Sequence, residues 1–514
     1  MMTRRSFLRS MGLFSMGLAV PRVGRSEVSG DGRTARRPNI VFILADDMGW
    51  GDVRVLNPAS HIPTIHLDRL ARSGITFTDA HAGSAACTPT RYGLMTGRHG
   101  FRNAASQGRV VLGFARAILE PKRLTLPMLL KQQGYETACF GKWNLGMDMP
   151  TTDGKPPNHR WKPTNINWDG VIRNGPLEAG FDRFYGMPGS LDMSPFVWID
   201  QNRFVAPAVE TRKNWKGVEG LGTPGFRFEK ALPEVARRTV DYIEQHQGKS
   251  VPFFLYMALP APHAPLVPLS SYRGRTDIGP YGDYCVELDE LVGQVLDALK
   301  RTGQAEDTLI CFTSDNGFWR VLGVEAMEAK GHLPSGGFRG YKAEIHEGGH
   351  RVPFFVSWPK GIEAGRITDE PVSILDWMAT VADLLGVDLP EQAAEDSLSL
   401  LPILENRPHS PIHPFMVHHS NNGSLAIRLG RWKFVDCPWD GNFDWQKRLP
   451  KGLQSKQLPP VQLYDMLEDP HETTNVYDRY PTVVKALQAI LARCRREGLR
   501  ALRGVDVSMV PQTR

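Results

Sequence analysis

The run Asn39-Ile-Val-Phe-Ile-Leu-Ala45, followed at once by Asp46-Asp47-Met-Gly-Trp-Gly-Asp52, sets the fold class of this 514-residue chain. Unbroken hydrophobicity over about seven residues is typical of a strand buried on both faces of a parallel sheet. Similar runs span residues 136–140, 252–258, 308–313 and 352–358. Helical patterns lie between them, clearest at residues 281–301 and weaker at 232–247 and 373–385. Alternating strands and helices predict an α/β fold with a large, mostly parallel sheet flanked by helices.

Polar residues follow four of these apolar runs directly. They are Asp46-Asp47, Gly141-Lys142-Trp143-Asn144, Pro260-Ala261-Pro262-His263 and Ser314-Asp315-Asn316-Gly317. In doubly wound sheets, ligands bind beyond the carboxyl ends of the strands. The sequence therefore predicts a functional site at this edge of the sheet.

Two of these segments carry hard oxygen ligands. Asp46, Asp47, Asp315 and Asn316 together suit Ca²⁺ or Mg²⁺, and suit zinc poorly because no histidine or thiolate cluster accompanies them. Each pair also has a structural interpretation, since Asp46-Asp47 is compatible with a helix cap and Asp315-Asn316-Gly317 with a turn.

A further segment, Cys87-Thr-Pro-Thr-Arg91 followed by Leu94-Met-Thr-Gly-Arg98, resembles the signature of the type I sulfatases. In that family the cysteine is oxidised to formylglycine, whose hydrated aldehyde is the nucleophile. The alternative is an ordinary cysteine before a helix that starts at Pro89. The resemblance runs from about Arg37 to about Gly498 and implies an alkaline phosphatase-like sandwich with a small C-terminal subdomain.

The resemblance also implies a role for each site residue. Position 87 would join Asp46, Asp47, Asp315 and Asn316 on one metal ion, calcium rather than magnesium. Arg91 would favour the alkoxide of the position-87 hydrate. Lys142 and Lys342 would hold sulfate oxygens, and His263 would protonate the leaving oxygen. By themselves, the two lysines are compatible with solvated surface charges and His263 with a loop residue satisfied by backbone groups.

Asn144 departs from the family pattern. Relatives commonly carry histidine here, in Gly-Lys-Trp-His-Leu-Gly, and an amide forms hydrogen bonds but does not titrate near neutral pH. We keep Asn144 among the catalytic candidates. His346 and His350 have no assigned role, although both are expected near the site.

The strand–helix alternation stops near Asp396. Residues 425–435 predict a β segment, 463–470 a strand and turn, and 481–495 a helix, in an order similar to the antiparallel C-terminal subdomain of sulfatases. We therefore divide the chain into a signal and linker at 1–37, a catalytic domain at 38–406 and an α+β subdomain at 407–514. The Gly- and Pro-rich loops 147–180 and 213–228 are predicted substrate-specific insertions.

The formal charge of +6 comes from the N-terminus, where residues 1–37 hold eight arginines and two acidic residues. The remainder is near neutral, which excludes a nucleic-acid partner. Arg4-Arg5 before the apolar run 11–20 resembles a twin-arginine (Tat) signal. That run is too short to span a bilayer. A basic N-terminal extension with no export role is the alternative. Export to the periplasm or outside, through the Tat translocon, is the prediction.

Six cysteines show no zinc-type pairing, and Cys139 and Cys311 lie in strand-like runs as small core residues. Tat substrates fold in a reducing compartment, so we expect no disulfide. This route also allows a formylglycine-generating or radical sulfatase-maturing enzyme to modify Cys87 before export.

The predicted function is hydrolysis of sulfate esters, either of a sulfated carbohydrate or of an aryl sulfate. One alternative is a phosphate or phosphonate ester hydrolase on the same scaffold. Another is an inactive protein that binds sulfated glycans. Trp50, Trp143 and Trp198 are compatible with stacking on a sugar, but core packing is the favoured interpretation for each.

Overall fold

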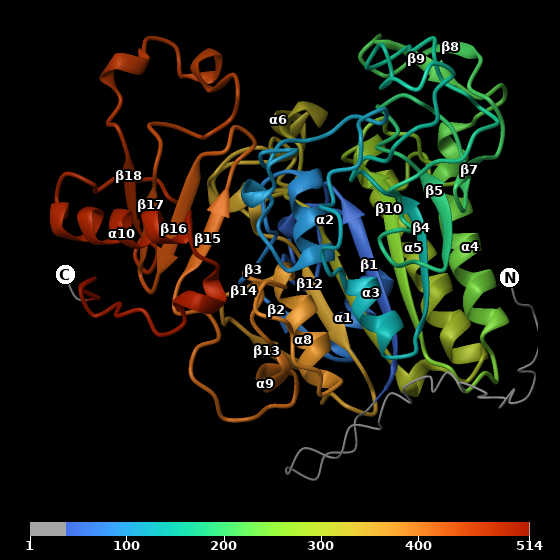
Figure 1. The fold of residues 1–514 in the computed structure, drawn as a ribbon. Coiled ribbons are helices and arrows are strands. Elements are labelled where there is room, and N and C mark those ends of the chain that lie inside the picture. Colours follow the sequence, from blue (N-terminus) through green and yellow to red (C-terminus); the bar gives the residue numbers. More distant parts are fainter. Residues whose placement is uncertain (1–36, 513–514) are drawn as a thin grey trace, which may run out of the picture. The chain divides into compact units, whose positions relative to one another are not determined.

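Strand β1 (Asn39–Asp46) lies at the centre of a ten-stranded sheet in a computed structural model that describes residues 37–512 (Figure 1). It pairs in parallel with β10 (Phe253–Pro262) on one side and β11 (Thr308–Ser314) on the other. Seven of its eight residues are buried, as predicted for a strand covered on both faces. The strand order of the sheet is β13-β2-β12-β11-β1-β10-β4-β5-β6-β7.

The centre of the sheet is parallel and its margins are mixed. Strands β11, β1, β10, β4 and β5 run parallel, whereas β12 is antiparallel to both β11 and β2. The other strands of this sheet are β2 (Ile75–Phe77), β4 (Glu136–Lys142), β5 (Arg183–Met187), β6 (Ile199–Asp200), β7 (Arg203–Phe204), β12 (Phe354–Ser357) and β13 (Arg366–Thr368).

Helices cover both faces, because alternate side chains of β1 enter two separate cores. Ile40, Phe42 and Leu44 pack in the first core and Val41, Ile43 and Ala45 in the second. On the first face lie α2 (Cys87–Thr96), α3 (Leu126–Gln132), α8 (Trp377–Leu384) and α9 (Leu401–Leu404). On the second lie α1 (Ile65–Arg72), α4 (Ala231–Gln245) and α5 (Pro280–Arg301).

The predicted strands and helices are present, with α5 and α4 matching the expected ranges closely. The predicted helix at 373–385 divides into a 3₁₀ turn and α8, because the Ser373 hydroxyl caps Leu375 N–H at its start. Cys139 and Cys311 are buried core residues, as expected. Short elements complete this part: β3 (Ala80–His81), β14 (Val372–Ser373), α6 (Val324–Glu328) and α7 (Glu347–His350).

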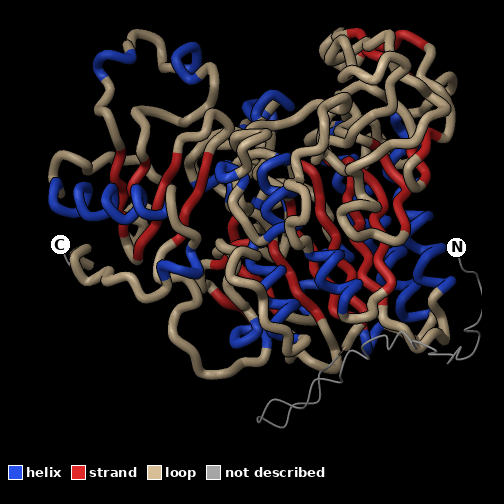
Figure 2. Tube along the Cα trace, in the orientation of Figure 1, coloured by secondary structure: helices blue, strands red, loops and turns tan. Residues whose placement is uncertain are grey.

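A second, antiparallel sheet follows in the C-terminal part, and Figure 2 shows its strands as a group apart from the large sheet. The predicted β segment 425–435 is a hairpin of two strands that turns at Gly430 (φ +55°). Helix α10 packs on this sheet through Leu487, Ile490 and Leu491. The elements are β15 (Met416–His419), β16 (Leu425–Leu429), β17 (Trp432–Val435), β18 (Gln462–Asp465) and α10 (Pro481–Cys494).

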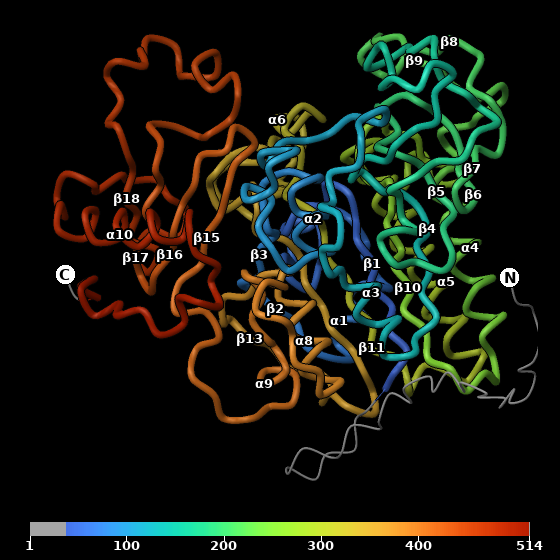
Figure 3. Tube along the Cα trace, in the orientation of Figure 1, coloured from blue at the N-terminus to red at the C-terminus, as the bar shows by residue number. Residues whose placement is uncertain are grey.

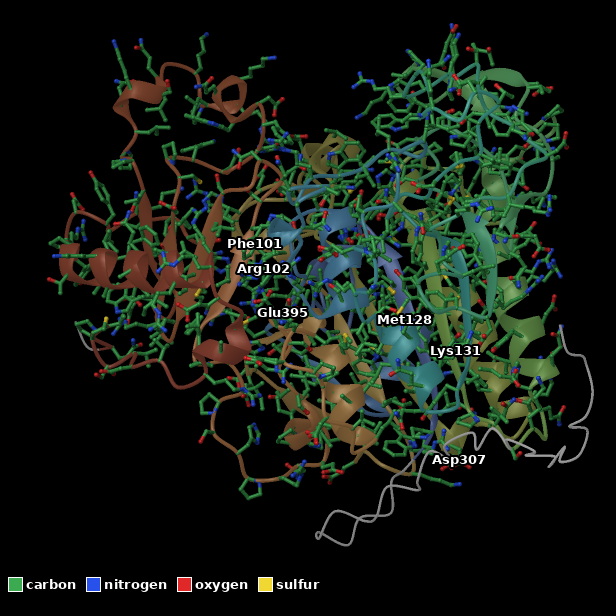
Figure 4. The ribbon with its side chains drawn as sticks, in the orientation of Figure 1. Phe101, Arg102, Met128, Lys131, Asp307 and Glu395 are labelled. Atoms are coloured by element: carbon green, nitrogen blue, oxygen red, sulfur yellow. The ribbon has the colours of Figure 1, made fainter. Side chains whose placement is uncertain are left out.

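Arg102 ties the end of helix α10 to the segment at Asp396, and Figure 4 labels it beside Phe101 at the margin of the C-terminal part. Its guanidinium pairs with Asp396 (Nε to Oδ2 2.7 Å) and donates to the carbonyl oxygens of Cys494 and Glu497. Both side chains of the ion pair are buried.

The predicted domain boundary at residue 406 lies between α9 and β15 and stays a prediction.

The predicted insertion at 213–228 includes most of a hairpin, β8 (Glu210–Lys213) and β9 (Glu219–Gly222), which Figure 3 traces at the end of the molecule near β5 and β7. No helix within residues 37–512 is long and apolar enough to cross a bilayer. The predicted signal segment falls almost wholly outside the described residues.

Candidate active site

The polar residues that follow the central strands meet at one edge of the sheet. Asp46 ends β1, Lys142 ends β4, His263 follows β10 and Asp315 follows β11. Since these strands are parallel and adjacent, with Ala45 in register with Ser314 and Asp46 with Pro262, their carboxyl ends converge. All four side chains are buried.

Three ion pairs hold the charged side chains of the site, of which Lys342 is partly buried and the other five are buried. Lys142 Nζ lies 2.8 Å from both carboxylate oxygens of Asp46. Arg91 Nε donates to Asp315 Oδ2 at 2.9 Å, and Lys342 Nζ donates to Asp47 Oδ1 at 2.6 Å. A buried charge is tolerated only when it is paired and hydrogen-bonded, so each carboxylate and cation depends on its partner.

Two of these pairs shift the pKa of Asp46 and of Lys342 toward the charged form. Burial alone would raise the pKa of Asp46, but the charge of Lys142 beside it lowers that pKa below its ordinary value. Burial alone would lower the pKa of Lys342, but the charge of Asp47 raises it well above its ordinary value. Lys342 therefore presents a positive charge near Cys87 across the physiological pH range.

Cys87 is the first residue of helix α2, with Ala86 as the extended N-cap. The helix thus begins two residues before Pro89, which corrects the alternative of a helix that starts at the proline. Its side chain is buried, and burial raises the pKa of the thiol above its ordinary value. A protonated thiol is a weaker nucleophile than a thiolate, so this environment does not activate an unmodified cysteine.

Two oxygen atoms in the site have no hydrogen-bond donor among the described residues. They are Asp47 Oδ2 and Asn316 Oδ1, and both residues are fully buried. Asn316 Nδ2 donates to Asp47 Oδ1 at 2.7 Å, which joins the two predicted ligand pairs. Orphaned buried oxygens are costly unless a cation satisfies them. The donor set, hard oxygens from Asp46, Asp47 and Asn316, fits Ca²⁺ or Mg²⁺.

His263 faces this group through one ring nitrogen. Its Nδ1 lies 2.7 Å from the carbonyl oxygen of Ala264, which accepts only, so Nδ1 carries the proton in the neutral ring. Its Nε2 lies 3.6 Å from Asp47 Oδ2. This orientation leaves Nε2 as the nitrogen that can gain or lose a proton at the site.

Three residues at the site hold left-handed backbone conformations without being glycine. They are Asp47 (φ +71°), Asn144 (φ +56°) and Ala343 (φ +78°), which follows Lys342. Asparagine and aspartate adopt this region more readily than most residues, whereas alanine does so at a cost. Backbone strain is thus concentrated beside the residues predicted to act.

The side chain of Asn144 forms its hydrogen bonds with residues other than Cys87. Its Oδ1 accepts from the Thr88 hydroxyl at 3.2 Å, and its Nδ2 donates to the Val111 carbonyl oxygen at 3.0 Å. It therefore contacts the residue after Cys87, and it orients the start of helix α2.

His346 and His350 bond away from the ion-paired group. His346 Nε2 lies 3.3 Å from Gln462 Oε1, whereas His350 Nδ1 lies 2.9 Å from His81 Nδ1 and its ring stacks on His418. Neither makes a hydrogen bond or ion pair with the residues of the candidate site.

The sequence interpretation missed an aromatic group at the rim. Trp319 lies beside His263, with Trp215 against its ring. The three tryptophans for which core packing was predicted contact other aromatic side chains: Trp50 contacts Phe338, Trp143 contacts Phe181 and Trp198 contacts Tyr185. Trp319 follows the Asp315-Asn316 segment closely, and Trp215 lies in a predicted insertion. These two positions are the features of the sequence that could have indicated an aromatic group at the site.

The fold and the convergence of carboxylates and cations around Cys87 define a hydrolase of the alkaline phosphatase superfamily. The sulfatase family model matches residues 38–387, and the chain belongs to that family. It is therefore a sulfuric ester hydrolase.

Known relatives agree over most of their length. The N-acetylgalactosamine-6-O-sulfatase of Bacteroides thetaiotaomicron is 29% identical, with 90% of this chain and 94% of the relative covered. Bovine arylsulfatase A is 33% identical, with coverages of 89% and 87%. A solved sulfatase from a study of glycosaminoglycan metabolism by B. thetaiotaomicron superposes with a TM-score of 0.76 at 28% identity, covering 90% of this chain and 99% of that one.

Proposed function

We propose that the protein hydrolyses the sulfate ester of a sulfated carbohydrate by means of formylglycine formed from Cys87. The observation that carries this proposal is the setting of Cys87. It begins a helix, is buried, and has Lys142 and Lys342 among its nearest charges. An unmodified thiol has no evident use there, whereas fixed cations suit an anionic substrate group.

Formylglycine, as its hydrate, would supply one hydroxyl to displace the alcohol at sulfur and a second to release sulfate. Asp46, Asp47, Asp315, Asn316 and position 87 would hold a divalent cation, with calcium preferred to magnesium. Bound there, the cation would supply positive charge that favours an ionised hydroxyl.

Four side chains of the protein would bind the substrate, stabilise charge and transfer the proton. Arg91, held by Asp315, adds positive charge beside position 87. Lys142 and Lys342 hold the sulfate oxygens, which carry the negative charge that builds up during transfer. His263, when its ring is doubly protonated, donates the Nε2 proton to the oxygen of the departing alcohol as its bond to sulfur breaks and returns to the neutral ring with the proton on Nδ1.

The relatives support a sulfated carbohydrate as the proposed substrate class. These relatives include an N-acetylgalactosamine-6-O-sulfatase and an arylsulfatase, so 6-sulfated N-acetylgalactosamine and 4-nitrophenyl sulfate are the first compounds to assay. A phosphonate monoester hydrolase of Agrobacterium radiobacter shares the fold (TM-score 0.57, 21% identity), which keeps phosphoryl transfer as the second candidate.

The test compares 4-nitrophenyl sulfate with 4-nitrophenyl phosphate and phosphonate, because the leaving group is then constant. Higher kcat/KM for the sulfate supports the proposal. Higher kcat/KM for a phosphorus ester would make the protein a phosphoryl hydrolase. Tight binding of sulfated glycans with no turnover of any ester would favour the inactive binding protein.

The proposal includes maturation before export. A formylglycine-generating or radical sulfatase-maturing enzyme would act on Cys87 in the cytoplasm, and the Tat translocon would then export the folded enzyme to the periplasm or medium. Replacing Arg4 and Arg5 with lysine should leave folded precursor in the cytoplasm, and undiminished export would refute this route.

A further inference from the structure

Trp319 borders the candidate active site. Its ring centroid lies 5.5 Å from that of His263 and 5.0 Å from Lys342 Nζ. These are the side chains assigned above to the leaving oxygen and to the sulfate. Trp319 is partly exposed, so part of its ring is open to a ligand next to the reacting group.

The hairpin β8–β9 extends this surface. Its loop carries Trp215, whose ring meets Trp319 at 5.7 Å in an edge-on arrangement and is 40% exposed. The next residue, Lys216, places Nζ 4.3 Å from the Trp319 ring centroid and 4.9 Å from that of Trp215. Lys216 forms no ion pair with any residue in the described range 37–512. A cation therefore lies over two aromatic rings, and Asp192 is the carboxylate whose charge acts on it.

The hairpin loop is held in place before any ligand arrives. Asn214 is buried, and its Oδ1 accepts from the backbone N–H groups of Lys216 and Val218 at 2.9 Å. Its Nδ2 donates to the Asp192 carbonyl oxygen at 2.9 Å. The loop is thus tied to the segment that carries Asp192, which reduces the entropy lost on binding.

Asp192 supplies an unused acceptor at the same rim. It is 9% exposed, and its Oδ1 has no hydrogen-bond donor among the described residues. That oxygen lies 4.0 Å from His263 Nδ1. A buried carboxylate oxygen without a donor is costly, and a hydroxyl group of a ligand would satisfy it.

We propose that Asp192, Trp215, Lys216 and Trp319 form a subsite for a saccharide that carries a second anionic group besides the scissile sulfate. The inference rests on the proposed function and narrows its substrate class. The apolar face of a sugar ring would pack on Trp319, and a sugar hydroxyl would donate to Asp192. The second anion, a carboxylate or another sulfate, would pair with Lys216.

The charges around Lys216 agree with this assignment. Burial lowers the pKa of Lys216, Asp192 opposes that shift, and the nearby charge of Lys342 adds to it. Lys216 Nζ and Lys342 Nζ lie 4.3 Å and 5.0 Å from the centroid of the Trp319 ring, so the two cations repel each other at this rim. A substrate with two anionic groups would relieve that repulsion, whereas a singly charged substrate would neutralise one of them.

The experiment uses the full-length, formylglycine-containing enzyme and four substrates. They are 4-nitrophenyl sulfate, N-acetylgalactosamine 6-sulfate, the same sugar with a second sulfate, and the disaccharide that joins it to a uronic acid. The variant is Lys216→Gln, and the matched control is Lys213→Gln, which removes an exposed charge from strand β8 of the same hairpin. The quantity compared is kcat/KM for each doubly anionic sugar divided by that for the singly sulfated sugar.

Lys216→Gln should lower this ratio about tenfold or more, because it removes a charge-assisted hydrogen bond. Lys213→Gln should leave it unchanged, and Lys216→Arg should keep most of it. A fall confined to the uronic acid disaccharide identifies a carboxylate as the partner, and a fall confined to the disulfate identifies a sulfate. Unchanged ratios in Lys216→Gln would overturn the subsite while aryl sulfate turnover persists. Absence of turnover of all four sulfate esters in the wild type would instead overturn the proposed function, and the subsite with it.

Discussion

Asp47→Asn tests the metal assignment most sharply, because it removes one charge and keeps the shape. Asp47 Oδ1 accepts from Lys342 and Asn316, and Oδ2 is one of the two orphaned oxygens. Breaking a buried ion pair from one side costs about 3–5 kcal/mol. We therefore expect the variant to lose roughly this much free energy of unfolding in chelator.

The gain in free energy of unfolding on adding calcium is a second, independent quantity. A ligand at 100 times its Kd stabilises the folded state by about 2.7 kcal/mol, so the wild type should gain about this amount over chelator. If the lost charge weakens binding about 100-fold, the variant gains only about 0.4 kcal/mol at the same calcium concentration. The calcium-dependent gain should therefore nearly disappear.

Urea unfolding followed by tryptophan fluorescence, in calcium and in chelator, measures both quantities. The control is Asp52→Asn. Asp52 is equally buried but accepts from the Gly49 N–H and the Tyr281 hydroxyl and pairs with His332 Nε2, and none of these residues is a candidate metal ligand. It should lose about 1–3 kcal/mol in both buffers alike. A full calcium gain in Asp47→Asn would show that Asp47 is not a ligand.

Three further predictions concern proton transfer, positioning and pH. His263→Ala should reduce kcat/KM on a sugar sulfate about 100-fold or more but that on 4-nitrophenyl sulfate far less, since nitrophenolate needs no proton to leave; equal losses would move His263 to binding. Asn144→Ala should cost about 1–3 kcal/mol of transition-state stabilisation on both substrates, because the amide orients Thr88, and wild-type rates would remove it from the site. Burial raises the pKa of Glu287 from 4.5 to about 7, so its neutral form is favoured in the fold and stability falls as pH rises from about 4.5 to about 7. Glu287→Gln should gain about 2–3 kcal/mol on the wild type at pH 8 relative to pH 4.5, and parallel pH–stability curves would contradict this.

The central strands and the residues after them were predictable because burial on both faces leaves an uninterrupted apolar run. Asp46 and Asp315 follow such runs, and parallel pairing brings them together. The direction of β12 was not predictable, because an apolar run has the same pattern in either orientation. The hairpin at 425–435 was missed although Gly430 marks its turn.

The rim of the site depends on contacts that no local pattern encodes. Trp215 and Trp319 are far apart in the sequence and meet because Asn214 fixes the hairpin loop to the Asp192 segment. His350 is near Lys342 in sequence, but α7 turns it toward His81 and His418. Closeness in sequence therefore wrongly placed His350 near the site, and it gave no indication that Trp215 and Trp319 are in contact.

The central claim is that residue 87 acts as formylglycine, and mass spectrometry of the peptide containing it tests this most directly. Preparations made with and without a maturation enzyme should differ in the fraction of Cys87 thiol replaced by aldehyde. We predict that turnover of 4-nitrophenyl sulfate rises in proportion to that fraction and is absent at zero conversion. Full activity in protein whose residue 87 is entirely unmodified cysteine would contradict the account.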